Sequence, residues 1–284
     1  MTHRTPRSIL ITGCSSGIGQ CAAAGLKARG WRVFATARRA EDVARLAGEG
    51  FESLRLDLDD PASIQAAVAA VLAATGGTLD ALFNNAAYGQ PGAVEDLSRA
   101  ALRAQFETNL FGTLELTNCV IPVMRAQGHG RIVNNSSLLG LVALPYRGAY
   151  NASKFALEGL TDTLRLELAG CGIHVALIEP GPIVSRFRAN ARAAFYRHID
   201  PAASPHRERY AGMERRLARP GPAAPFTLPP EAVLAKLIAA LESPRPRVRY
   251  YVTVPTRLFA WLRRLLPYRL LDRVLLRVSA GENR

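Results

Sequence analysis

The sequence predicts an α/β fold, with a doubly wound parallel sheet and helices on both faces. Apolar runs of strand type alternate with helical segments from Ile9 to Ile178, and parallel strands need crossovers that helices supply. The 284 residues, 49% of them hydrophobic, can bury a substantial core. We find no internal repeat and no second domain, so a single domain is expected.

The first predicted element is a strand at residues 8–11, followed by a glycine-rich turn at residues 12–19 and an Ala-rich helix. This order is typical of a Rossmann fold. Glycines allow a tight turn and a close ligand, and the following helix N-terminus can hold a diphosphate, although a lone glycine loop can also be a simple connection. The cofactor-binding residues predicted in this turn are Gly13, Ser15, Ser16, Gly17, Ile18 and Gly19.

The second predicted strand, residues 31–37, ends at Arg38 and Arg39. At this place an acidic residue would bind the ribose hydroxyl of NAD, whereas a basic residue pairs with the extra phosphate of NADP. Two solvated surface arginines are the alternative interpretation. The sequence therefore favours NADP(H) over NAD(H), with Arg38 as the first choice for the phosphate.

A third motif combines Ser137, Tyr150 and Lys154. Residues 131–137 form an apolar strand with a polar end, and such strand ends bind ligands in open parallel sheets. Tyr150 and Lys154 lie one helical turn apart, so an ammonium can lower the phenol pKa from its usual ~10. Alone, this pair is ordinary helix sequence and the serine an ordinary loop cap. Their order along the chain favours an acid/base site.

Together these motifs resemble those of the short-chain dehydrogenase/reductase family, and in particular its NADP-preferring steroid and retinol dehydrogenase-like members. The resemblance covers residues 8–185 and implies hydride transfer between a nicotinamide and a CH-OH carbon. It implies that Tyr150 exchanges a proton with the substrate oxygen, that Ser137 orients this oxygen, and that Lys154 lowers the Tyr150 pKa and holds the ribose.

The same resemblance assigns further residues. Asn109 would hold a water beside Lys154, which extends a proton relay and completes the catalytic set. Residues 84–87 match an Asn-Asn-Ala-Gly segment, except that Ala87 replaces the glycine. The remaining cofactor contacts that the resemblance implies are Asp57, Leu58, Asn85, Ala86, Pro180, Gly181, Ile183 and Ser185, besides Tyr150 and Lys154.

We expect residues 1–254 to form the catalytic domain, with residues 186–230 as a substrate lid. Five aromatic residues of the lid would face an apolar substrate or pack the lid onto the domain: Phe187, Phe195, Tyr196, Tyr210 and Phe226. Residues 231–242 read as an amphipathic helix and residues 248–254 as a final strand. A lipophilic alcohol or carbonyl substrate follows from family analogy and from the apolar C-terminal part.

Residues 255–284 form a predicted basic amphipathic extension, with six arginines between Arg257 and Arg277. A helix with apolar and arginine-bearing faces can lie in a membrane interface, giving a peripheral contact. Packing on the domain or on a second subunit is an equal alternative. Pro267 and the charges exclude a spanning helix. A homo-oligomer is expected because family members are commonly dimers or tetramers.

Composition excludes other classes. The formal charge of +13 comes from arginines spread along the chain, without a recognised module or basic-aromatic groove, so we expect no nucleic-acid partner. Four cysteines, at positions 14, 21, 119 and 171, lack metal-ligand spacing, so we expect no metal and reduced thiols. The short polar residues 1–7 read as a frayed terminus without a signal peptide, which predicts a cytoplasmic protein. A non-catalytic dinucleotide-binding scaffold is the alternative function.

Overall fold

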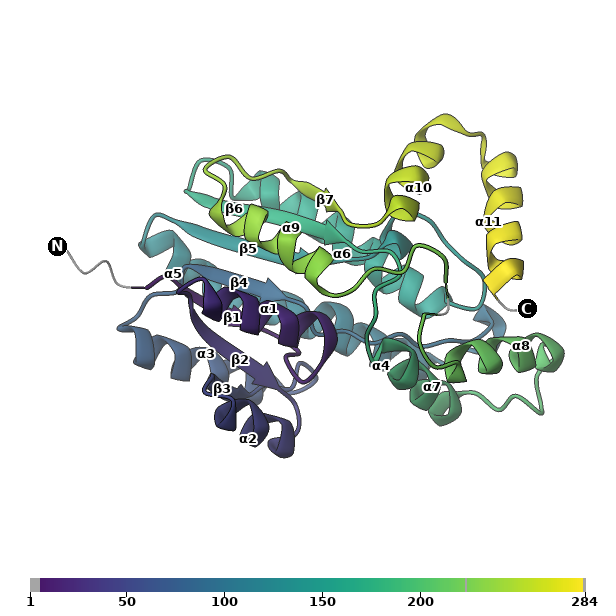
Figure 1. Ribbon diagram of the computed structural model, residues 1–284, viewed down its shortest axis with the longest axis horizontal. Helices are drawn as coiled ribbons and strands as arrows, with labels where there is room; N and C mark the ends of the chain where they lie inside the picture. Colours follow the sequence, from purple (N-terminus) through teal and green to yellow (C-terminus); the bar gives the residue numbers. More distant parts are fainter. Residues whose placement is uncertain (1–5, 223, 283–284) are drawn as a thin grey trace.

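One parallel sheet, in the order β3-β2-β1-β4-β5-β6-β7, organises the computed structural model, which describes residues 6–222 and 224–282 (Figure 1). Residues 1–5 of the predicted frayed terminus lie outside the described part. The predicted single-domain Rossmann fold is confirmed. The strands are β1 (Ser8–Ile11), β2 (Arg32–Ala37), β3 (Glu52–Arg55), β4 (Ala81–Asn84), β5 (Gly130–Asn135), β6 (Ile173–Glu179) and β7 (Arg249–Tyr251).

Helices cover both faces of the sheet, and successive side chains of a strand point to opposite faces. Ile9 and Ile11 pack against one group of helices, and Leu10 packs against the other. The first group is α1 (Gly17–Ala28), α2 (Ala40–Gly48) and α9 (Glu231–Glu242); the second is α3 (Pro61–Thr75), α5 (Gly112–Ala126) and α6 (Gly148–Glu167). The strand order reverses direction between β1 and β4, which creates a crevice at their carboxyl ends.

β1 has its predicted bounds, whereas β2, β5 and β7 are shorter than predicted. Trp31 precedes β2, and Ser136 and Ser137 follow β5. The final strand stops at Tyr251 because helix α10 (Val254–Leu265) starts there, with the Thr253 hydroxyl accepting a hydrogen bond from the Thr256 N–H at 3.4 Å. Helix α11 (Tyr268–Glu282) follows Pro267.

The predicted lid consists mainly of α7 (Phe187–His198) and α8 (Arg207–Ala218). Figure 1 shows these helices near α4 (Arg99–Phe106), beyond the carboxyl ends of the central strands. The Tyr210 hydroxyl accepts a hydrogen bond from the Ala93 N–H at 2.8 Å and donates one to Asp96. These bonds attach α8 to the loop that follows β4.

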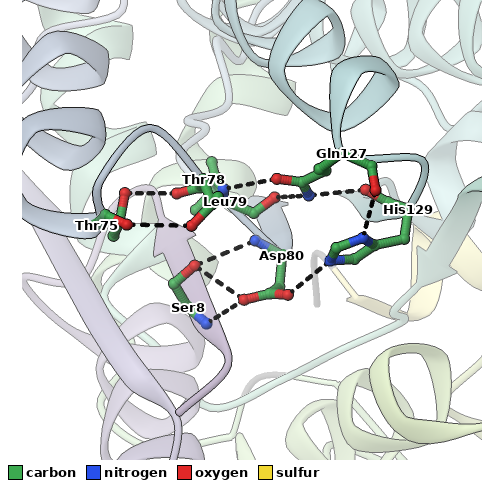
Figure 2. A network of polar contacts seen from close by, with 7 residues as sticks. All are labelled: Ser8, Thr75, Thr78, Leu79, Asp80, Gln127 and His129. Carbon is green, nitrogen blue, oxygen red and sulfur yellow. Dashed lines mark hydrogen bonds and ion pairs between the residues drawn. The ribbon is translucent and has the colours of Figure 1, made fainter. Parts of the chain in front are cut away.

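At the opposite, amino ends of the strands, a polar network ties the sheet to its connections (Figure 2). The Asp80 carboxylate accepts hydrogen bonds from the Ser8 N–H at 2.7 Å and the Ser8 hydroxyl at 3.1 Å. His129, just before β5, lies 3.0 Å from the other Asp80 oxygen. Gln127 bonds both the N–H and the carbonyl of Leu79. Three neighbouring strand starts, β1, β4 and β5, are thereby fixed together.

Candidate active site

A cavity of about 740 Å³ lies at the carboxyl ends of the strands. Its lining comes from the loops after β1, β2, β3, β4, β5 and β6, from α6 and from the lid. The predicted site residues that line it are Gly13, Ser15, Ser16, Ile18, Arg38, Arg39, Asp57, Leu58, Asn85, Ala86, Ser137, Tyr150, Lys154, Pro180, Gly181, Ile183 and Ser185. Gly17, Gly19 and Asn109 do not line it.

The glycine turn needs its glycines for space and for backbone conformation. Gly13 has a φ of 72°, and a Cβ on it would lie 2.9 Å from the Ala86 Cα. A Cβ on Gly19 would lie 2.1 Å from the Gly13 carbonyl oxygen. Only glycine fits at either position. The turn can therefore bring its amides, and the N-terminus of α1, close to a diphosphate.

Two residues that the sequence analysis did not single out hold this turn. The Thr12 hydroxyl accepts hydrogen bonds from the N–H groups of Asn85 at 2.8 Å and Ala86 at 2.9 Å. The Arg45 guanidinium donates to the Ser15 carbonyl at 2.8 Å. A Thr directly after β1 is a signal that sequence reasoning could have used, whereas Arg45 belongs to α2 and is brought to the turn only by the tertiary fold.

Ala87, which replaces a glycine of the family pattern, causes no strain. The non-glycine residues with positive φ in the described part of the chain are Tyr146 and Phe226. Ala87 therefore adopts a backbone conformation that a side chain tolerates.

Arg38 and Arg39 follow β2 as predicted, and both are exposed at the rim of the cavity. Arg39 forms an exposed ion pair with Glu41 at 3.5 Å. Arg38 has no such carboxylate partner in the described residues. Of the two, Arg38 is therefore the cation more readily available to a phosphate.

Ser137, Tyr150 and Lys154 meet on the opposite side of the cavity. Tyr150 and Lys154 lie on the inner face of α6, and Ser137 follows β5 directly. The Lys154 ammonium donates a hydrogen bond to the Asn135 carbonyl at 2.7 Å and lies 5.8 Å from the centroid of the Tyr150 ring. Ser137 lies within hydrogen-bonding reach of the Tyr150 hydroxyl.

Burial of the Tyr150 phenol, and not the charge of Lys154, has the largest effect on the Tyr150 pKa. Desolvation raises the pKa of Tyr150 to about 12, and the hydrogen bond from Ser137 opposes this shift. Burial also lowers the pKa of Lys154 to about 8, against the attraction of Glu158. In this geometry the Lys154 ammonium is directed at a backbone carbonyl, and desolvation has a larger effect than charge on both groups. That Lys154 lowers the Tyr150 pKa stays a prediction.

Asn109 lies in a π-helical turn, Glu107–Phe111, and is buried. Its side chain accepts from the Tyr88 N–H at 3.1 Å and donates to the Tyr88 carbonyl at 2.9 Å and to Ser153 at 3.2 Å. Its hydrogen bonds thus fix the Tyr88 loop at the cavity wall. The water-holding role beside Lys154 stays a prediction.

Of the five lid aromatics, Phe187 lines the cavity. Its ring meets the Tyr150 ring edge-on, with centroids 5.2 Å apart, and lies above Gly89, where a Cβ would come within 2.8 Å of it. Phe195 and Tyr210 are buried in the lid's own core, and Tyr196 and Phe226 are exposed outside the cavity. Phe195 and Tyr210 therefore follow the packing alternative, whereas Tyr196 and Phe226 do not contact the cavity.

Metal-ligating side chains and cysteine thiols have no part in the site formed by Ser137, Tyr150 and Lys154. Within residues 6–222 and 224–282, no cluster of three or more His, Cys, Asp or Glu side chains could hold a metal ion. The four cysteines are free thiols. Burial raises the pKa of Cys14 in the glycine turn to about 12, so it stays a thiol at neutral pH.

Comparison with known proteins identifies similar chains. The family model described as short chain dehydrogenase matches residues 7–194. Oxidoreductase YbbO of Escherichia coli K12 is 44% identical over 269 residues, 95% of this chain and 94% of the relative. Human retinol dehydrogenase 8 is 35% identical over 256 residues, 86% of this chain and 80% of the relative.

Among solved structures, a short chain dehydrogenase/reductase from Burkholderia phymatum in complex with NAD superposes with a TM-score of 0.77. It shares 27% identity and covers 97% of this chain and 96% of its own. The cavity and its glycine cradle lie where such a fold binds a nicotinamide dinucleotide.

Proposed function

Because the chain belongs to the short-chain dehydrogenase/reductase family of oxidoreductases, we propose that it interconverts an alcohol and a carbonyl on a lipophilic substrate, with NADP(H) as cofactor. The observation that carries the proposal is the shared cavity, in which Ser137, Tyr150 and Lys154 face a glycine cradle fit for a dinucleotide. Arg38 supports NADP over NAD.

The residues of the cradle would hold the diphosphate, and the bound nicotinamide would supply or accept the hydride. Ser137 orients the substrate oxygen through its hydroxyl. Tyr150, with a pKa of about 12, is a neutral phenol at pH 7 and therefore acts as the proton donor to this oxygen. Lys154 holds a positive charge beside the forming phenolate. This protonation state suits carbonyl reduction.

A lipophilic substrate is supported by the cavity wall opposite the cradle. Leu138, Leu139 and Leu144 line it next to Ser137, and Phe187 covers Tyr150. Retinol, named for one relative, is a molecule of this class. Apolar walls with few polar groups bind apolar molecules and orient them.

The test is NADPH and NADH oxidation over aldehydes and ketones of increasing apolar size, with Tyr150→Phe as the control variant. We expect turnover that prefers NADPH, rises with substrate size and falls by at least about 10²-fold in the variant, since it lacks its proton donor. Dinucleotide binding without turnover, with the reverse alcohol assay also silent, would favour the non-catalytic scaffold instead.

The remaining sequence predictions are part of this proposal: a catalytic domain of residues 1–254 with an extension at 255–284, a homo-oligomer and a cytoplasmic location. In the described residues, no helix is both long enough and apolar enough to cross a membrane. Gel filtration with light scattering measures the oligomeric state directly.

A further inference from the structure

Helix α10 carries apolar side chains on two opposite faces. On the inner face, Phe259 and Ala260 are buried, and Phe259 packs with Val142 and Leu144 of the domain. Leu271 and Leu275 of α11 join the same cluster. The two C-terminal helices therefore pack on their own domain through these side chains, which is one of the arrangements that the sequence left open.

The outer face of α10 has an apolar stripe that this packing leaves exposed. Its members are Val254, Leu258, Trp261 and Leu265, spaced so that they share one side of the helix. Trp261 is 62% and Leu265 69% exposed, and Tyr268, just beyond Pro267, is 85% exposed. Single exposed apolar residues are common, but four in register on one helix form a patch that marks an interaction site.

Arginines border this α10 stripe. Arg257 and Arg264 lie on its flank, and Arg269, Arg273 and Arg277 follow on α11. These five make no ion pair with a carboxylate of the described residues. Asp272 is the sole acidic residue between positions 254 and 281. Figure 1 shows α10 and α11 as a helical pair beyond the end of β7, at one extremity of the molecule.

We propose that the α10 stripe and its arginines are a docking surface for an anionic lipid bilayer. An interfacial helix inserts its apolar side at the level of the headgroups, with Trp near them and arginines beside anionic lipid. A second copy of the chain fits this surface poorly, because a two-fold contact through the stripe would bring the two arginine sets together. An anionic membrane supplies the complementary charge.

Docking here would bring the membrane near the active-site cavity. The inner face of α10 packs with Leu138 and Leu139, and both residues line the cavity beside Ser137. An apolar substrate dissolved in the bilayer would then lie near the wall that receives it. This consequence depends on the proposed function, whereas the docking itself does not.

The chain has a built-in reporter, because it contains two tryptophans and the other one, Trp31, is buried. In Trp31→Phe, fluorescence reports on Trp261 alone. We expect a blue shift and co-sedimentation with vesicles of phosphatidylcholine and phosphatidylglycerol, little binding to pure phosphatidylcholine, and release as NaCl concentration rises. Absence of binding to the anionic vesicles would overturn the proposal, whatever the protein's catalytic activity.

Variants separate the two parts of the surface. Leu258→Ser with Leu265→Ser, and separately Arg257→Glu with Arg264→Glu, should each weaken vesicle binding by at least about tenfold. The matched controls are Leu166→Ser, an equally exposed leucine at the end of α6, and Arg125→Glu at the end of α5, which should bind as the parent does. Unchanged binding in the α10 variants, or a Trp261 blue shift that depends on protein concentration without lipid, would contradict a lipid surface; the latter result would indicate self-association.

Discussion

At the scale of single residues, the active site shows burial outweighing charge. A lysine near a tyrosine predicts a lowered phenol pKa, yet desolvation raises the pKa of Tyr150 to about 12 and lowers that of Lys154 to about 8. Both shifts disfavour the charged form, as expected when two groups lose water together. The sequence predicts the partners correctly but contains no direct measure of how far each is buried.

The Lys154 pKa predicts the pH dependence of carbonyl reduction. If a charged Lys154 is needed, kcat/KM should fall as pH rises through about 8, where the ammonium loses its proton. Because Glu158 raises the Lys154 pKa, Glu158→Gln should move this fall to lower pH. Steady-state rates from pH 6 to 10 measure both. A fall that stays in place in Glu158→Gln would argue against Lys154 as its cause.

Arg38 and Arg39 form a matched pair for the cofactor choice. Arg38→Ala should raise KM for NADPH by about tenfold and leave KM for NADH nearly unchanged, because it removes a cation from the 2′-phosphate. Arg39→Ala, whose arginine pairs with Glu41, should change either value much less. Equal losses with both cofactors in Arg38→Ala would exclude it as the phosphate ligand.

At the scale of elements, one arginine joins three neighbours. Arg249 of the edge strand β7 forms ion pairs with Glu158 and Asp162 of α6 and with Glu179 of β6, the last at 2.5 Å. Glu158 and Glu179 are buried, and burial raises the pKa of Glu179 to about 8. A strand of three residues has few ladder hydrogen bonds, so these pairs are a major part of its attachment.

Arg249→Met should therefore lower the free energy of unfolding by about 3–5 kcal/mol, because it leaves buried carboxylates without their cation. A raised carboxyl pKa in the folded state means that folding takes up protons, so stability should fall as pH rises from about 5 to 8, and more steeply in the variant. Urea unfolding at several pH values tests this. Arg247→Met, at an exposed position beside β7, is the control; equal losses in both variants would refute a specific role.

Phe187 is the lid aromatic that contacts the active site. Phe187 covers the Tyr150 ring and occupies the space above Gly89 that a Cβ would fill. Phe187→Ala should raise KM for large apolar carbonyls by about tenfold, through loss of contact area, and change kcat less. Gly89→Ala should displace the ring and produce the same pattern. If Gly89→Ala has the KM of the parent while that of Phe187→Ala is raised, the exact position of the Phe187 ring does not determine substrate affinity.

Elements were predicted where the pattern was local. The glycine turn, α9 and the β5 to α6 motif follow from neighbouring residues, and α9 was found at its predicted bounds, Glu231–Glu242. The end of β7 was missed because Thr253 and Pro255 start a helix inside an apolar run. The sequence left two alternatives open for the lid aromatics because Phe195 and Tyr210 are buried by contacts between α7, α8 and the β4 loop, which no local pattern reveals.

At the scale of the whole molecule, the carboxyl ends and the amino ends of the strands have different roles. The carboxyl ends carry the cavity, its glycine cradle and the Ser137, Tyr150 and Lys154 set. The amino ends carry the network of Asp80, which joins the starts of β1, β4 and β5. The strands separate these two groups of residues, so substitutions at the amino ends should change the stability of the protein without changing the chemistry at the carboxyl ends.

Asp80→Ala should therefore destabilise the protein without changing its chemistry. Removal of the carboxylate leaves the Ser8 N–H and hydroxyl without their acceptor, which should cost about 1–3 kcal/mol. Thermal unfolding measures this loss, and kcat/KM well below the Tm should stay within about twofold of the parent. Asp80→Asn, which retains an acceptor for Ser8, should be affected less. A tenfold loss of kcat/KM at unchanged Tm would instead mean that the amino ends of the strands influence the cavity. The separation of the two roles would then be wrong.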